Sequence, residues 1–208
     1  GRFLISERNT SVDVIIIAVG MERRYMILFV NACVRSNSRT KELASALLSK
    51  LEGDVCEVDL TKKDFPVLDE AFLNMREKLI ADKDFGGKIF ELARQFAEAD
   101  TIVIAAPYYD LSFPASLKQY LEQINVRGIT FEYSPEGFPI PLCKAENLYY
   151  VTTAGGAFVP EEFGYGYVKA LAEGFYGIRK VRQIRAVGLD IYGADVEKIM
   201  SETETELI

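Results

Sequence analysis

The sequence contains no histidine among its 208 residues. This absence excludes Ser-His-Asp and Cys-His nucleophilic mechanisms and removes the most common ligand of zinc and non-haem iron sites. The cysteines Cys33, Cys56 and Cys143 are far apart and form no C-x-x-C pair, which disfavours both a disulfide framework and a metal knuckle. We therefore expect no bound metal, no catalytic imidazole, and a reducing, cytoplasmic compartment.

Positively charged residues are outnumbered by negatively charged ones, and long apolar runs are lacking. The chain has 24 Lys and Arg against 31 Asp and Glu, a net charge of −7, which disfavours general attraction to nucleic acid or anionic lipid. No stretch approaches the roughly 18 apolar residues of a membrane-spanning helix. We expect no nucleic-acid or membrane partner, and any bound anion must be held by local groups.

The first 25 residues form a separate segment in our interpretation. Their short apolar run, residues 14–19, loosely resembles a secretion signal, but Asp13 and the shortness of the run disfavour that interpretation. We predict an N-terminal extension over residues 1–25, of unknown role, whose β-branched residues 12–17 could add a strand, and one domain over residues 26–208.

From Met26 onward, short β-rich runs alternate with helical stripes, the pattern of βαβ units around a parallel sheet. The predicted strands are residues 26–30, 54–60, 101–105, 148–152 and 182–191. The predicted helices contain residues 43–51, 72–79, 89–96, 117–124, 167–176 and 196–200, the first of them ending near Gly53, and residues 129–137 form a strand or hairpin insertion. The fold class is therefore α/β, a flavodoxin-like three-layer sandwich with strand order 2-1-3-4-5 and helices on both faces.

In this strand order, ligands bind beyond the carboxyl ends of the strands where the order reverses, so the loops after Val30, Ala106 and Thr152 should converge. The first loop, residues 31–40, is rich in hydroxyls and amides and leads directly into a helix. Its hydroxyls, its guanidinium groups and the helix N-terminus suit a phosphate monoester. The alternative is ordinary N-capping by Ser38 or Thr40 with exposed arginines. Neither G-x-G-x-x-G nor G-x-x-x-x-G-K-[ST] is present.

The other two loops suit a flat aromatic ligand. Residues 106–114 place Tyr108 and Tyr109 at the end of the third strand, and residues 152–158 include Gly155 and Gly156, which let a ring approach the backbone closely. The alternative is a pair of plain turns, one bounded by proline and one made by the two glycines.

In this order along the chain, the motifs resemble those of the FMN-dependent NADH-azoreductase branch of the NAD(P)H:quinone oxidoreductases. The motifs are residues 35–40 (RSNSRT), 106–113 (APYYDLSF), 117–120 (LKQY), 128–133 (GITFEY), 153–156 (TAGG), 174–178 (GFYGI) and 192–193 (YG). The resemblance implies bound FMN, with NADH or NADPH as co-substrate. The cofactor-binding residues that we predict with it are Arg35, Ser36, Ser38, Arg39, Thr40, Pro107, Tyr108, Tyr109, Asp110, Leu111, Thr153, Ala154, Gly155, Gly156 and Phe158.

The resemblance also implies a homodimer in which Phe131 and Tyr133 reach across to the partner's substrate pocket. Ala154 and Phe158 stand where the family often has a polar or basic residue and a histidine, so the flavin environment and the substrate range are expected to differ. The implied reaction is ping-pong hydride transfer through the flavin to a quinone, azo or nitro acceptor, with no catalytic side chain.

Three alternatives stay open: a flavodoxin-type electron carrier, an NADPH-dependent FMN reductase, and a flavin-free regulatory or binding protein. The aromatic insertion between Phe131 and Phe138 and the pair Tyr192-Gly193 favour the dimeric enzyme over a monomeric carrier.

Overall fold

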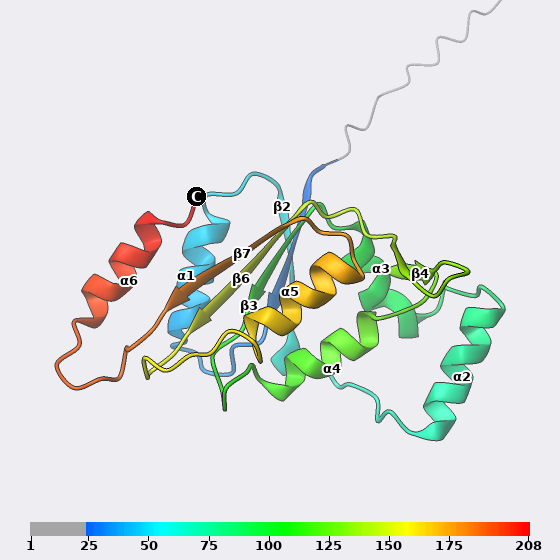
Figure 1. Ribbon diagram of the computed structural model, residues 1–208, viewed down its shortest axis with the longest axis horizontal. Coiled ribbons are helices and arrows are strands. Elements are labelled where there is room, and N and C mark those ends of the chain that lie inside the picture. The colour runs from blue at the N-terminus through cyan, green and yellow to red at the C-terminus, as the bar shows by residue number, and fades with distance from the viewer. Residues whose placement is uncertain (1–23) are drawn as a thin grey trace, which may run out of the picture.

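The computed structural model describes residues 24–208, so the strand expected within residues 12–17 lies outside the described residues. Five parallel strands form the main sheet, in the order β2-β1-β3-β6-β7 (Figure 1). Their bounds are β1 Met26–Asn31, β2 Asp54–Asp59, β3 Thr101–Ala105, β6 Asn147–Thr153 and β7 Lys180–Ala186. This is the predicted order, with the two hairpin strands β4 and β5 inserted in the numbering.

Burial along the strands follows their place in the sheet. All five residues of the central strand β3 are buried, as its unbroken apolar run predicts for a strand covered on both faces. Only Val58 is buried in β2, whose polar, alternating sequence fits the edge position it occupies.

Helices cover both faces of the sheet and complete three layers. On one face, α1 (Arg39–Leu48) and α6 (Val196–Thr205) bury Leu43, Leu47 and Met200. On the other, α3 (Glu91–Glu98), α4 (Ala115–Ile124) and α5 (Tyr165–Gly174) enclose a second core around Phe96 and Tyr120. None of the helices within residues 24–208 is long and apolar enough to cross a membrane.

Two excursions interrupt the alternation of strands and helices. Helix α2 (Glu70–Ala81) buries none of its residues and projects from one end of the molecule (Figure 1), held by Arg76, which donates to the carbonyl oxygens of Glu122 and Asn125. The predicted insertion forms an antiparallel hairpin of β4 (Phe131–Tyr133) and β5 (Pro139–Pro141). Two short 3₁₀ helices, η1 (Leu60–Lys62) and η2 (Lys88–Phe90), complete the elements within residues 24–208.

Two predicted element ends are wrong. Helix α1 ends at Leu48 rather than near Gly53, because the amides of Lys50 and Leu51 turn back to carbonyls three residues earlier. Strand β7 ends at Ala186 rather than Ile191, because Gly188 adopts a positive φ of 77° and turns the chain away from the sheet. The segment 187–195 therefore forms a loop at the carboxyl edge of the sheet.

Candidate functional site

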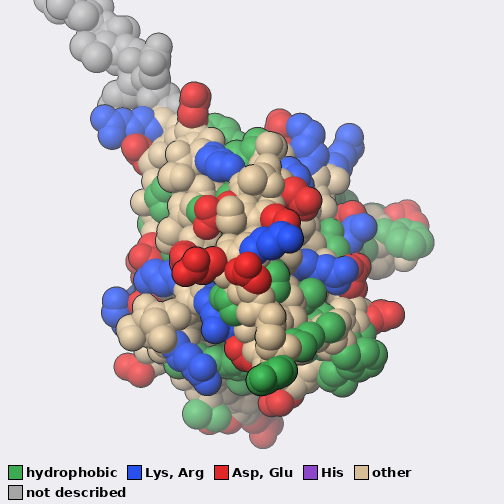
Figure 2. Space-filling view, turned by 90° about the vertical axis from the view of Figure 1, so that its left-hand side faces the viewer, with side chains coloured by type: hydrophobic (Ala, Val, Ile, Leu, Met, Phe, Trp, Pro, Cys, Tyr) green, Lys and Arg blue, Asp and Glu red, His purple; other side chains and the backbone are tan. Residues whose placement is uncertain are grey.

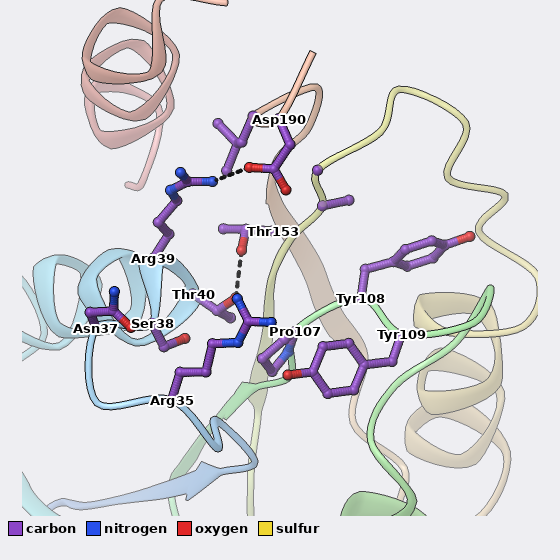
Figure 3. A pocket seen from close by; sticks show the side chains of 13 residues that line it. Arg35, Asn37, Ser38, Arg39, Thr40, Pro107, Tyr108, Tyr109, Thr153 and Asp190 are labelled. Atoms are coloured by element: carbon purple, nitrogen blue, oxygen red, sulfur yellow. Dashed lines mark hydrogen bonds and ion pairs between the residues drawn. The ribbon is translucent and has the colours of Figure 1, made fainter. Parts of the chain in front are cut away.

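The three loops predicted to converge do line one pocket at the carboxyl edge of the sheet, with a cavity of about 270 Å³ (Figure 3). Ten of its lining residues belong to the predicted set: Arg35, Ser38, Arg39, Thr40, Pro107, Tyr108, Tyr109, Thr153, Ala154 and Gly155. Three lining residues, Asn37, Leu189 and Asp190, were not predicted.

The first wall is the loop between β1 and α1. The buried side chain of Asn31 accepts from the amide of Cys33 (2.9 Å) and donates to Glu57 (2.8 Å), which fixes the loop where it leaves β1. Ser38 caps α1 by accepting from the amide of Lys41 at 3.3 Å. Ser38 is therefore the N-cap, as one interpretation expected, although Arg39 is half-buried and paired with Asp190 rather than free. The same capped N-terminus opens on the pocket, where its amides favour an anion.

The floor of the pocket joins helix to sheet through two threonine hydroxyls. Thr40, only 1% exposed, lies with its Oγ1 2.6 Å from Oγ1 of Thr153. The amide of Tyr108 donates to the carbonyl of Thr153 at 3.1 Å, so the second loop is anchored to the end of β6. Loops from three different elements therefore keep fixed positions around the pocket.

The second loop narrows into a tight turn whose tip is Asp110 and Leu111. Both have positive φ, 48° and 70°, which is uncommon for residues with a side chain, and two backbone hydrogen bonds between Tyr109 and Ser112 close the turn. The turn keeps Tyr109 at the pocket and places the two tip residues outside its lining.

The segment after β7 forms a fourth wall. Its backbone is held on the third loop by three hydrogen bonds, in which the amides of residues 188, 189 and 190 donate to the carbonyls of residues 156, 154 and 155. Asp190 consequently lies against Gly155, where any Cβ would meet its carboxylate, and pairs with Arg39 at 2.8 Å. Gly188 and Gly193, both with positive φ, were the sequence signal that this segment is a loop.

Several predicted residues do not line the pocket. Ser36, Asp110, Leu111, Gly156 and Phe158 are exposed beside it, and 78% of the Phe158 side chain is accessible.

The predicted substrate residues also lie elsewhere. Phe131 is 7% exposed and packs edge-on against Phe175 at 4.8 Å within its own subunit, whereas Tyr133 is 46% exposed. Of the two, only Tyr133 is available on the surface.

Three charged side chains line the pocket: Arg35, Arg39 and Asp190. Nearby, burial raises the pKa of the Cys33 thiol, against the opposing effects of Ser38 and Lys41, so Cys33 is a protonated packing residue. Burial also raises the pKa of Tyr108. No cluster of three potential metal-ligating side chains occurs in residues 24–208.

The doubly wound sheet places a helix N-terminus and two backbone-rich loops around one pocket at its switch point, an arrangement typical of α/β proteins with a ligand site at this edge. Residues 26–207 match the model of the flavodoxin-like fold family, and the chain belongs to that family.

Curated relatives carry a functional name. The chain is 33% identical to an FMN-dependent NADH:quinone oxidoreductase of Clostridium perfringens, over 85% of this chain and 92% of the relative. It is 35% identical to an FMN-dependent NADH:quinone oxidoreductase 2 of Clostridium acetobutylicum, over 86% and 94%. Among solved structures, an azoreductase from Bacillus anthracis superposes with a TM-score of 0.74 at 26% identity, covering 88% of this chain and 96% of that one.

Proposed function

We propose that this protein is an FMN-dependent NADH:quinone oxidoreductase that also reduces azo compounds. The observation that carries the proposal is the meeting of the α1 N-terminus with the Tyr108 and Gly155 loops in one pocket at the switch point of the sheet. The named relatives, each matched over most of its length, support the same activity.

The pocket fits FMN at both ends. The capped N-terminus of α1, Ser38 and the exposed Arg35 offer amide, hydroxyl and guanidinium donors to a phosphate. At the other end, Pro107, Tyr109 and Gly155 offer an apolar, aromatic and side-chain-free surface to a flat ring. When bound, FMN supplies the hydride chemistry between NADH and the acceptor.

The chain's own contribution is to bind and orient. The hydrogen bonds of Thr40 and Tyr108 to Thr153 tie the first and second loops to the end of β6, so these residues would position a ring bound between the loops. The turn at Asp110 keeps Tyr109 in the pocket lining, where its ring would limit the access of water to a bound flavin. No side-chain acid or base is assigned to the reaction.

We also propose that two copies assemble around this pocket. Its volume of about 270 Å³ lies below the roughly 300–1,000 Å³ of most ligand sites, as expected if a partner completes it. Apolar side chains that follow the pocket segments are exposed: Phe158 by 78% and Tyr192 fully. Tyr133 and Phe138 of the hairpin are 46% and 70% exposed. The ring of Phe131 packs edge-on against that of Tyr133, with 5.3 Å between the ring centroids.

The family match begins at residue 26, which supports our proposal that residues 26–208 form the catalytic domain and residues 1–25 an extension. A variant starting at residue 26 is expected to keep full FMN affinity. A loss of FMN affinity in this variant would show that residues 1–25 contribute to the FMN site.

The test of the proposed function is a titration of flavin-free protein with FMN, followed by steady-state assays with NADH and a benzoquinone or azo dye. We expect saturable quenching of flavin fluorescence, acceptor-dependent NADH oxidation and a dimer by light scattering. FMN binding by a monomer without NADH oxidation would instead identify an electron carrier, and no binding at all would refute the flavoprotein assignment.

A further inference from the structure

The pocket contains an ion pair that the sequence motifs did not indicate. Arg39, in the first turn of α1, is directed toward Asp190 on the opposite wall, with Nη1 2.8 Å from Oδ1, while Arg35 projects separately beside Pro107 (Figure 3). We propose that Asp190 is a specificity-determining residue that holds the charge of Arg39 and thereby limits the affinity of the pocket for phosphorylated flavin. This inference rests on the proposed function.

Asp190 owes its position to the backbone around it. The amides of Leu189 and Asp190 donate to the carbonyls of Ala154 and Gly155 at 3.2 and 3.0 Å, so the backbone at Asp190 is held on the third loop. A Cβ on Gly155 would lie 2.9 Å from the Asp190 carboxyl carbon, so only glycine leaves room for the carboxylate there. The held backbone therefore presents the Asp190 carboxylate at the pocket, where its side chain is 69% exposed and pairs with Arg39, whose side chain is 41% exposed.

The effect of Asp190 on phosphate affinity follows from the charged side chains that line the pocket. Arg35 and Arg39 are partly balanced by Asp190, so the lining carries one net positive charge toward an incoming phosphate dianion. Replacing Asp190 by asparagine leaves two positive charges and frees the Arg39 guanidinium to turn toward the phosphate. Outside the pocket, acidic and basic side chains are interspersed on the molecular face shown in Figure 2, so no uniform surface field there would mask this local change.

The experiment compares FMN with riboflavin, which has the same ring and no phosphate. We expect Asp190→Asn to bind FMN about three- to tenfold more tightly than the unmodified chain, from the Coulomb energy of one charge facing a dianion across a solvated pocket. Riboflavin affinity stays unchanged, which also shows that the variant is folded. The gain in FMN affinity shrinks at about 1 M salt, where the screening length falls to roughly 3 Å.

The matched control is Glu146→Gln, which removes an exposed carboxylate directly before β6, at the opposite edge of the sheet. It should leave both affinities unchanged. In the Asp190→Asn background, Arg39→Met should reduce FMN affinity more than it does in the unmodified chain, because Arg39 is then free to contact the phosphate.

Weaker FMN binding by Asp190→Asn, or an equal change for riboflavin, would overturn the inference while leaving the proposed function intact. Failure of the unmodified chain to bind FMN would overturn the proposed function and the inference together.

Discussion

Arg35 gives the sharpest test of how the pocket binds phosphate. It lines the pocket beside the N-terminus of α1, and its side chain is exposed, unlike the buried Thr40 next to it. A hydrogen bond to a charged group contributes about 1.5–3 kcal/mol, and solvent around Arg35 places it at the lower end. At about 1.4 kcal/mol per factor of ten, Arg35→Met should weaken FMN binding roughly ten- to thirtyfold.

Fluorescence titration with FMN and with riboflavin measures this effect directly. Riboflavin affinity should change less than twofold, because the ring-binding loops are untouched. Lys180→Met, which removes an exposed cation at the start of β7 on the opposite edge of the sheet, is the matched control and should bind FMN normally. Equal losses for FMN and riboflavin, or no loss with FMN, would refute the placement of the phosphate beside Arg35.

Three further predictions concern stability, measured by urea denaturation. Thr40→Val leaves the Thr153 hydroxyl without its 2.6 Å partner and should lower the free energy of unfolding by about 1–3 kcal/mol. Thr40→Ser keeps the hydroxyl and loses only a buried methyl group, so its cost should be smaller, about 1 kcal/mol; a larger cost for Thr40→Ser than for Thr40→Val would show that the hydrogen bond does not stabilise the fold. Tyr120→Phe should raise the free energy of unfolding by about 1 kcal/mol, because the buried Tyr120 hydroxyl has no hydrogen-bond partner within residues 24–208. A decrease would show that this hydroxyl does have a hydrogen-bond partner. The hydrogen bond from Thr61 lowers the pKa of Asp59, so the stabilisation by Asp59 is complete above its unfolded pKa of about 3.9 and is lost as pH falls through the folded value. Asp59→Ala should therefore cost about 1 kcal/mol at pH 6 and progressively less below pH 4; a cost independent of pH would contradict this assignment.

The sheet was predictable because its signals are local and repeated. The run from Met26 to Val30 and the run from Ile102 to Ala105 are continuous and apolar, which is typical of a strand covered on both faces. The strand order was predicted as the simplest doubly wound arrangement with helices on both faces, and because the strands are parallel the three loops lie at one edge. The location of the pocket, at the carboxyl ends of the central strands, was therefore predictable from the sequence.

The identity of the side chains that line the pocket was less predictable. Residues up to Ile191 contain enough apolar positions to extend β7, and only the positive φ at Gly188, a property of the folded backbone, ends the strand before Asp190. Phe131 and Tyr133 are both aromatic and two residues apart, but packing on Phe175, which is distant in sequence, buries the first and leaves the second exposed. The burial of Phe131 depends on a tertiary contact that no local pattern contains, whereas the loop after β7 had a local signal in Gly188.

The central claim is that the α1 N-terminus holds the phosphate of FMN while the Tyr108 and Gly155 loops hold its ring. A crystal structure of the FMN complex tests it most directly. We predict phosphate oxygens within hydrogen-bonding distance of the backbone amides of residues 36–40 and the ring between Pro107 and Gly155. A flavin bound outside this pocket, or one with its ring at the helix terminus, would contradict the claim.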